Sequence, residues 1–438
     1  MFPHSPDHGP ATPGAPAPSA RLAPFRTVLA NGTVVTAKET RKTPAVTMNL
    51  AIRAGSLCDP PDGAGATFLL SKLLDRGTAR RSAGDIADAL ETRGASLSFS
   101  VNRHVLSVLC TCLSADFDAV LDIIGDVLIQ PAIPAAELAP RKSEVVTAIA
   151  QDEDSPYITA VQRLMGMLYG EDHPYGRSLK GSAASIERLT RERLLELHRS
   201  RFAPSELSLV VVGDLAPSRV VDVASRLFGA WTAPRPAPVP LAHPVPATAR
   251  RRLVVPMMNK SQADVAYGFT TIERSDPTYY ATLLMNNILG QYALGGRLGD
   301  SIRERQGMAY YVSSGFEANL VAGPLMIRAG VAPANVDRAV ASIDEELTRI
   351  RTDGVTEKEL TESRQYLVGS MPRSLETNAG IAHFLQNAEF FGLGLDYDAR
   401  LADLLGGVTL DDVHSAARRT LDPERATIVI AGPYDDAA

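Results

Sequence analysis

The sequence predicts an α+β fold of two homologous domains, each a mainly antiparallel sheet with helices packed on one face. Three observations lead to this prediction. The chain has 438 residues, and a single hydrophobic core stops growing at about 250–300 residues, so two domains are expected. A helix, turn and strand occur twice at a constant offset. In both halves, strand-rich segments precede runs of helices, which is typical of α+β domains.

The repeat consists of residues 189–213, LTRERLLELHRSRFAPSELSLVVVG, and residues 408–432, VTLDDVHSAARRTLDPERATIVIAG. Each has a helical pattern with an acidic start, a proline-containing turn and a strand that ends in glycine. The two stretches end 219 residues apart (432 − 213), and Pro204 and Pro423 have the same separation (423 − 204). We interpret the chain as a tandem duplication.

Composition divides the chain into four parts. Residues 1–24 hold seven prolines and no apolar core of the kind that a secretory signal requires, so a disordered arm is expected. Residues 231–252, WTAPRPAPVPLAHPVPATARRR, are rich in proline and have no apolar period, which is typical of a stiff, extended linker. The two domains then cover residues 25–230 and 253–438.

Periodicity places the elements in order. The first domain is expected to hold strands in GTVVTAKE and AVTMNLAIRAGS, a capped helix in SAGDIADALETRG, a hairpin in ASLSFSVNRHVLSVLCTCL, and helices over 116–128 and 135–151. The second is expected to hold strands in KSQADVAYGFT and GPLMIRAGV, and helices over 277–289, 335–351 and 357–370.

Charge and cysteine content exclude several classes of partner. The net charge is −6 and Lys and Arg form no long run, so no nucleic-acid or anionic-membrane partner is expected. No apolar stretch reaches the ~18 residues needed to cross a bilayer. Cys58, Cys110 and Cys112 are odd in number, and a C-x-C within a strand lacks metal-site spacing. A reduced, cytoplasmic protein is therefore expected.

Three motifs carry a family resemblance: RAGSLCDPPDGAGATFLLSKLLDRGT, EDHPYGRSLKG and LGGRLGDSIRERQGMAYYVSS. Their order resembles the pitrilysin and insulinase-type zinc peptidases, most closely the small two-domain class typified by the mitochondrial processing peptidase. The likeness runs from about Val28 to the C-terminus. It implies a chain that forms half of a clamshell around unstructured peptides.

The zinc motif of this family is degenerate here. In H-x-x-E-H, two His four residues apart bind zinc and the Glu activates water. Counting back from the Gly-Thr that trails the motif, these positions fall on Phe68, Ser71 and Lys72, and the third ligand position falls on Ala148. Glu144 lies one helical turn from Ala148, which leaves a slipped alignment open. This chain is therefore expected to hold no metal.

Two readings remain open for Lys72. It either plugs the former site together with Phe68, or its ammonium takes the former zinc position and pairs with a carboxylate such as Glu144. His173, in the second motif, is expected to be a structural turn residue.

The second half keeps a pair of polar residues that the resemblance identifies as functional. Arg303 and Tyr310 match the Arg and Tyr that face the metal across the chamber of the family and hold the substrate carbonyl. The alternative is that neither residue is functional, with Arg303 solvated on a helix and Tyr310 half-buried in a strand. Tyr311 would point to the other face of that strand and is the less suitable member.

The glycines before this pair have two interpretations. Gly290, Gly295 and Gly296 form either an ordinary loop with positive φ angles or a flexible lip that touches the incoming peptide. The second interpretation makes Gly295 and Gly296 substrate-binding residues.

The first functional hypothesis is a non-catalytic subunit of a heterodimeric zinc peptidase. A homologous subunit would carry H-x-x-E-H and the zinc, while this chain would supply Arg303 and Tyr310 across the interface, and peptides would add as a strand to an open sheet edge. The second is a proteolytically inactive structural or peptide-binding protein of the same fold. A third is a self-sufficient metallopeptidase with ligands that match no known motif.

Overall fold

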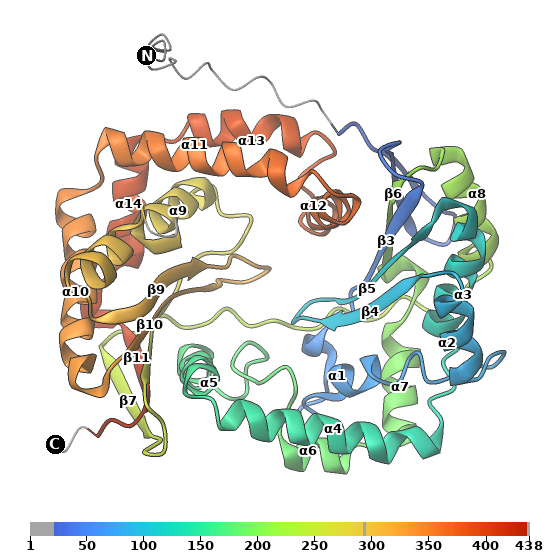
Figure 1. Ribbon diagram of the computed structural model, residues 1–438, viewed down its shortest axis with the longest axis horizontal. Helices are drawn as coiled ribbons and strands as arrows, with labels where there is room; N and C mark the ends of the chain where they lie inside the picture. Colours follow the sequence, from blue (N-terminus) through green and yellow to red (C-terminus); the bar gives the residue numbers. More distant parts are fainter. Residues whose placement is uncertain (1–21, 292–294, 436–438) are drawn as a thin grey trace, which may run out of the picture.

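The computed structural model describes residues 22–291 and 295–435, and its strands form two sheets, one in each half of the chain (Figure 1). The first sheet has the strand order β1-β2-β6-β3-β5-β4 and the second has the order β7-β11-β8-β10-β9. The strands of the first sheet are β1 Phe25–Val28, β2 Val34–Glu39, β3 Ala45–Ile52, β4 Ser96–Val101, β5 Leu106–Leu113 and β6 Leu207–Gly213. Those of the second are β7 Arg251–Pro256, β8 Ala263–Thr270, β9 Ala309–Phe316, β10 Pro324–Val331 and β11 Thr427–Gly432.

The two sheets share one topology once β1 is set aside. In each, the first strand pairs in parallel with the last strand of that half, β2 with β6 and β7 with β11. The remaining pairs are antiparallel, with the hairpins β4–β5 and β9–β10 at the far edge. The predicted fold class, two homologous and mainly antiparallel α+β units, is confirmed.

The helices follow the predicted order. The first half has α1 Ala66–Ser71, α2 Ala83–Glu91, α3 Phe117–Ile129, α4 Ala135–Glu153, α5 Pro156–Tyr169, α6 Ala183–Arg188, α7 Arg191–Arg201 and α8 Pro217–Phe228. The second has α9 Tyr279–Asn286, α10 Val336–Asp353, α11 Glu357–Ser374, α12 Asn378–Phe390, α13 Tyr397–Gly406 and α14 Leu410–Thr420. Periodicity missed α5 and α12, the two helices that pack on the sheet of the other half. None of the helices in residues 22–291 and 295–435 combines the length and apolar character that a bilayer crossing needs.

Each half has its own core on one face of its sheet. In the first half, Leu50 and Val108 of the sheet join Leu69 of α1 and Ile124 of α3 in one buried cluster. In the second half, Ile327 lies in the equivalent cluster, together with side chains of α9, α10 and α14. This arrangement is the one-sided helix packing that the pattern predicts.

The opposite face of each sheet is covered by a helix from the other half (Figure 1). Helix α12 contacts β6 and β3, where Ile381 and Leu385 pack with Val210. Helix α5 contacts β8 and β11, where Leu164 packs with Val429. The two halves are therefore interlocked by an exchange of helices, which adds a second layer that the sequence did not reveal.

The proline-rich segment between the halves is an extended strap on the surface. From residue 233 onward, about every third residue is half-buried, as in a polyproline II helix that rests on one side. Arg201 donates from Nη1 to the carbonyl of Ala237 at 2.8 Å, and Nε2 of His173 lies 2.9 Å from the carbonyl of Ala242. The segment is thus tied to the first half.

The last residues of the segment predicted as a disordered arm are packed against the fold. Residues 1–21 lie outside the described part of the chain. Leu22 is buried in the cluster between the first sheet and α12, and its N–H donates to Oδ2 of Asp398 at 2.7 Å. The chain is therefore anchored to the second half before β1 begins.

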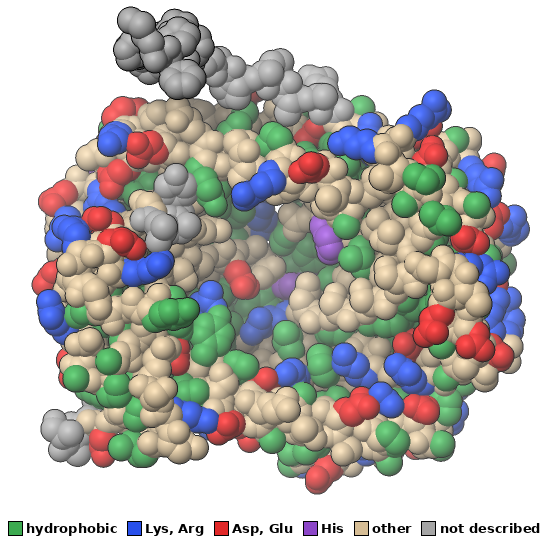
Figure 2. All heavy atoms as spheres, in the orientation of Figure 1, with side chains coloured by type: hydrophobic (Ala, Val, Ile, Leu, Met, Phe, Trp, Pro, Cys, Tyr) green, Lys and Arg blue, Asp and Glu red, His purple; other side chains and the backbone are tan. Residues whose placement is uncertain are grey.

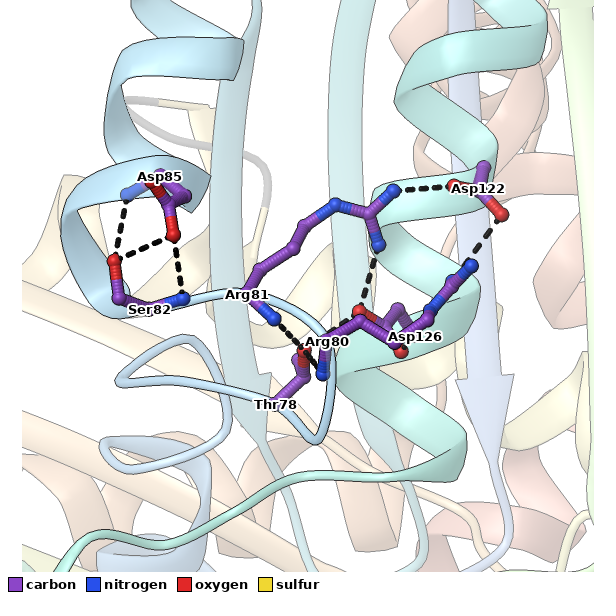
Figure 3. A network of polar contacts seen from close by, with 7 residues as sticks. All are labelled: Thr78, Arg80, Arg81, Ser82, Asp85, Asp122 and Asp126. Carbon is purple, nitrogen blue, oxygen red and sulfur yellow. Dashed lines mark hydrogen bonds and ion pairs between the residues drawn. The ribbon is translucent and has the colours of Figure 1, made fainter.

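A polar network fixes the segment that follows α1 (Figure 3). The carboxylate of Asp126 on α3 accepts from the Thr78 hydroxyl at 2.6 Å, from Arg80 Nε at 2.9 Å and from Arg81 Nη1 at 2.7 Å. Asp122, one turn earlier, accepts from both arginines. Burial alone would raise the pKa of Asp126, but these hydrogen bonds outweigh it and the pKa is lowered.

The capped helix predicted after this segment is confirmed. In α2 the Ser82 hydroxyl accepts from the Asp85 N–H at 3.1 Å, and the Asp85 carboxylate accepts from the Ser82 N–H at 2.9 Å (Figure 3). This reciprocal capping box satisfies donors that the first turn of a helix leaves open.

We expect Asp126→Asn to lower the free energy of unfolding by about 2–3 kcal/mol, because it removes a buried carboxylate that accepts from Thr78, Arg80 and Arg81 and leaves the two arginines with Asp122 alone. Asp118→Asn is the matched control, since Asp118 also lies on α3 and pairs with two arginines but is 37% exposed. The control should cost less than about 1 kcal/mol. Urea unfolding of both variants measures the difference, and equal losses would contradict a special role for Asp126.

The same pair of proteins tests the pH dependence. Because the pKa of Asp126 is lowered on folding, its contribution is complete above the unfolded-state pKa and is lost as the pH falls through the folded-state value. The stability difference between the parent and Asp126→Asn should therefore be constant near neutrality and shrink below pH ~4.

Candidate functional site

The site that the resemblance indicates begins at α1, and a buried aspartate fixes the start of that helix. Asp59 accepts from the N–H groups of Gly65 and Thr67, both at 2.8 Å, and from the Thr67 hydroxyl at 2.7 Å. Gly65 has φ 88°, and a Cβ there would lie 2.3 Å from the carbonyl oxygen of Lys180. Burial raises the pKa of Asp59 to about 6 although these hydrogen bonds oppose the shift. Sequence reasoning missed Asp59, even though an acidic residue ahead of a helix is a known capping signal.

Two of the three zinc-motif positions face one another on α1. The Lys72 Nζ lies 5.3 Å from the centroid of the Phe68 ring, so the residues four apart share one face of the helix. Phe68 is half-buried and Lys72 is exposed. Ser71 is 3% exposed, and its hydroxyl donates to the Phe68 carbonyl at 2.7 Å. The spacing is that of the motif, but the side chains are a phenyl ring, an ammonium and a hydroxyl already in use.

The third ligand position lies on α4, which contacts α1. Ala148 is half-buried there, and the exposed Glu144 pairs with Arg141, with Nη1 and Oε1 2.7 Å apart. The suggested pairing of Lys72 with Glu144 is therefore wrong, because the carboxylate is held by an arginine on its own helix.

These residues do not fit a zinc ion. Zinc needs at least three imidazole, thiolate or carboxylate ligands, and the four positions supply none. Within the described ranges, no group of three or more His, Cys, Asp or Glu could hold a metal. The side chains at these four positions are therefore not a zinc ligand set.

An open sheet edge lies beside α1. Strand β4 is the last strand of the first sheet and contacts α1. Its residues Ser96, Ser98 and Ser100 are exposed. Because no described strand pairs with its outer side, β4 presents backbone donors and acceptors to a further strand.

In the second half, Arg303 and Tyr310 are both accessible. Arg303 lies in the π-helical segment Gly299–Arg305, its side chain is 46% exposed, and its Nε is 3.7 Å from the Oε1 of Glu304. Tyr310 is in β9, the edge strand of the second sheet, and is 85% exposed. Its phenol is therefore open to solvent and to any molecule that meets the edge of the second sheet.

The neighbour of Tyr310 is engaged elsewhere. The Tyr311 hydroxyl donates to Oδ1 of Asp264, and its ring lies 6.2 Å from that of Tyr157 on α5. Tyr311 thus points to the α5 side of the sheet, as strand alternation requires. Of the two tyrosines, Tyr310 is the one free to meet another molecule.

The positive φ angles of the first interpretation are not found at Gly290 or Gly296, and close packing explains the glycine at position 296. Gly296 is buried, and a Cβ there would lie 2.8 Å from the Cα of Gly290. Gly295 is exposed. Residues 292–294, between Gly290 and Gly295, lie outside the described part. Arg297 anchors the end of the loop through a 2.6 Å contact from Nε to Oε1 of Glu359.

His173 has the structural role expected of it. Its Nδ1 accepts from the Tyr175 N–H at 3.0 Å, and its ring stacks on Tyr169 with centroids 5.4 Å apart. With its Nε2 at the Ala242 carbonyl, the imidazole joins the turn to the strap. No nitrogen is left for a metal.

Comparison with known families finds two matches along the chain. Residues 34–181 match the family described as insulinase (peptidase family M16). Residues 188–367 match the domain described as the peptidase M16 inactive domain.

Relatives and solved structures agree with these matches. A protein of Mycobacterium tuberculosis named an uncharacterized zinc protease is 28% identical over 425 residues, 95% of either chain. One of Streptomyces coelicolor with the same description is 26% identical over 94% of this chain and 90% of the relative. A structure described as a peptidase M16 inactive domain from Pseudomonas fluorescens has a TM-score of 0.87 at 28% identity, covering 94% of this chain and 98% of the other. A Helicobacter pylori protease gives 0.87 at 17% identity, covering 94% and 100%, and supports the fold alone.

Restoring ligands tests the identification of the degenerate site. We expect the purified chain to retain far less than one zinc per molecule, whereas the triple variant Phe68→His, Lys72→His, Ala148→Glu should bind zinc stoichiometrically, because three ligands then converge from α1 and α4. Metal analysis after exhaustive dialysis measures both. Ala148→Glu alone is the control and should bind none. Stoichiometric, tightly held zinc in the unaltered chain would contradict the identification.

Proposed function

The chain belongs to the insulinase, or M16, family of peptidases, and from this premise we propose that it is the non-catalytic subunit of a heterodimeric zinc peptidase that cleaves unstructured peptides. A homologous subunit with an intact H-x-x-E-H motif would hold the zinc. This chain would close the chamber and contribute Arg303 and Tyr310 to the partner's site.

The observation that carries the proposal is a contrast between the two candidate sites. The zinc positions have lost every side chain that could bind a metal, while Arg303 and Tyr310 remain accessible. The 85% exposed phenol of Tyr310 lies on an edge strand, where a donor can reach a bound molecule. The retained pair therefore favours a role in a reaction carried out elsewhere in the complex.

The chemistry of the pair suits a peptide carbonyl. A guanidinium offers a rigid fork of N–H donors and a phenol offers one O–H donor. Donors aimed at an oxygen that gains negative charge stabilise the tetrahedral intermediate more than the substrate. Arg303 and Tyr310 would act in this way on a peptide bound near the partner's zinc. Gly295, which is exposed in the preceding loop, would touch the same peptide.

The peptide would bind through its backbone. Strand β4 offers an unpaired edge with small serine side chains, so an extended peptide can pair with it and be read mainly through its amides. An unstructured peptide can adopt the extended conformation that this pairing needs without unfolding a protein. Unstructured peptides are thus the substrate class that the edge favours.

The experiment compares this chain alone with a mixture containing a homologous H-x-x-E-H subunit, using a fluorogenic peptide. We expect no hydrolysis by the single chain and zinc-dependent hydrolysis by the mixture. Arg303→Ala should lower kcat/KM of the mixture about 100-fold. Tyr310→Phe, which removes one hydroxyl, should lower it about tenfold.

Arg305→Ala is the matched control, because Arg305 lies in the same helical segment and pairs with Asp300 at 2.9 Å. It should leave kcat/KM within about twofold, as expected for an exposed ion pair. An equal loss in Arg303→Ala and Arg305→Ala would refute the specific role of Arg303. A mixture that binds peptide but never cleaves it would instead favour the second hypothesis, an inactive peptide-binding protein.

A further inference from the structure

A cavity of about 320 Å³ lies where the two halves and the strap meet. It is bounded by the end of β3, the end of α7, strap residues 235–241, the turn between β9 and β10, and α12. Its volume is at the lower end of the ~300–1,000 Å³ typical of small-ligand sites. Figure 2 shows a hollow in the middle of the face in view, with Lys, Arg and His side chains on its wall.

We propose that this cavity binds the free carboxylate end of a peptide whose last residues are apolar. The proposal rests on the proposed function only in taking peptides as the ligand class. It concerns a site distinct from the zinc positions and from the Arg303 and Tyr310 pair, none of which lines the cavity.

The apolar part of the wall comes from several elements. Leu57, Val239 and Leu241 line it from the first half and the strap, Phe390 from α12, and Leu320 from the β9–β10 turn. Leu320 is 53% exposed in spite of its size. Covering apolar surface of this kind stabilises a complex in proportion to the area removed from water.

The rim is positively charged. Arg53, Arg201 and Arg235 line the cavity with Glu206 as the one carboxylate. Arg235 pairs with Glu206 at 3.9 Å. Arg201 donates to the Ala237 carbonyl, and the Arg53 guanidinium lies 5.7 Å from the Phe390 ring centroid. Within the described ranges, neither arginine has an ion pair with a carboxylate. Two guanidinium groups can therefore receive an anion, and their planar fork matches a carboxylate.

An adjoining cavity of about 220 Å³ shares His104 and Phe390 with the first. Its lining includes no Lys, Arg, Asp or Glu, and its polar groups are mainly amide side chains, including Asn49 and Asn387. Asn49 is 2% exposed and its Oδ1 has no hydrogen-bond partner, and His104 is 8% exposed with an unpartnered Nδ1. Buried polar atoms without partners are costly, so these two groups point to a ligand that supplies hydrogen bonds.

The state of His104 fits such a ligand. Burial, aided by the charge of Arg103, lowers the pKa of His104 to about 4, so the imidazole is neutral at physiological pH. Its Nε2 lies 2.7 Å from the Tyr175 hydroxyl, leaving Nδ1 for the ligand. Peptide groups offer both N–H and C=O for the Asn49 and His104 atoms. A fatty acid would meet the arginines but leave these atoms unpaired, which is why we commit to a peptide.

The test measures binding to this chain alone, by fluorescence polarisation of an N-terminally labelled hexapeptide that ends in Leu-Phe. We expect saturable binding of the free-carboxylate peptide and at least tenfold weaker binding of its C-terminal amide. Arg53→Gln and Arg201→Gln should each remove most of this preference. Arg199→Gln is the control, since Arg199 lies on α7 two residues before Arg201 but does not line the cavity.

Equal binding of the acid and the amide would overturn the proposal, as would an equal loss in Arg199→Gln. Displacement of the peptide by octanoate at equal or lower concentration would overturn it in favour of an acyl-chain site. Because neither a partner subunit nor hydrolysis is involved, failure here is distinguishable from failure of the proposed function. Thermal unfolding of each variant shows whether it is folded before binding is measured.

Discussion

The exchange of α5 and α12 between the halves is the constraint on which the rest of the structure depends. Each sheet has a second apolar face that its own half cannot cover, and the helix of the other half covers it. A fully buried Leu is worth about 1.5–3 kcal/mol relative to an exposed one, and Leu164 and Leu385 are both at least 97% buried in these contacts. Neither sheet can therefore move away from the other without exposing a core. The exchange of helices also brings together the hairpin turns β4–β5 and β9–β10 (Figure 1). Asn102 of the first turn and Asn319 of the second both line the 220 Å³ cavity.

The same packing explains how the metal site could lose its chemistry while the fold stayed intact. The start of α1 is held by Asp59 and the segment after it by Asp126, and Leu69 and Leu70 are fully buried. None of these interactions involves the former ligand positions. Lys72 is exposed, and Phe68 is only partly buried at the edge of the core cluster, so neither side chain is among the fully buried residues that hold α1 in place. Structural zinc sites differ, because there the metal supplies folding energy directly.

Local sequence patterns predict much of the architecture. The constant offset of Pro204 and Pro423 predicted the duplication, and the shared strand topology bears it out. The helix exchange was beyond such patterns, because periodicity shows that a helix has an apolar face but not which sheet receives it. The pairing of Lys72 with Glu144 failed for a similar reason, since Arg141 competes for the carboxylate from one turn away on the same helix. The 220 Å³ cavity is lined by residues as far apart in the sequence as Asn49 and Phe390. No local sequence pattern links these residues.

Arg303 and Tyr310 differ from their neighbours in the second half in how few contacts they make within the chain. Arg303 and Tyr310 sit among residues that are satisfied within the chain: Tyr311 is held by Asp264, and Arg305 by Asp300. Their own partners in the described structure amount to one adjacent carboxylate at 3.7 Å. A residue kept for stability would be expected to have contacts that supply that stability. Contacts with another molecule are what the proposed function would supply for this pair, and Tyr310 lies on the open edge strand β9.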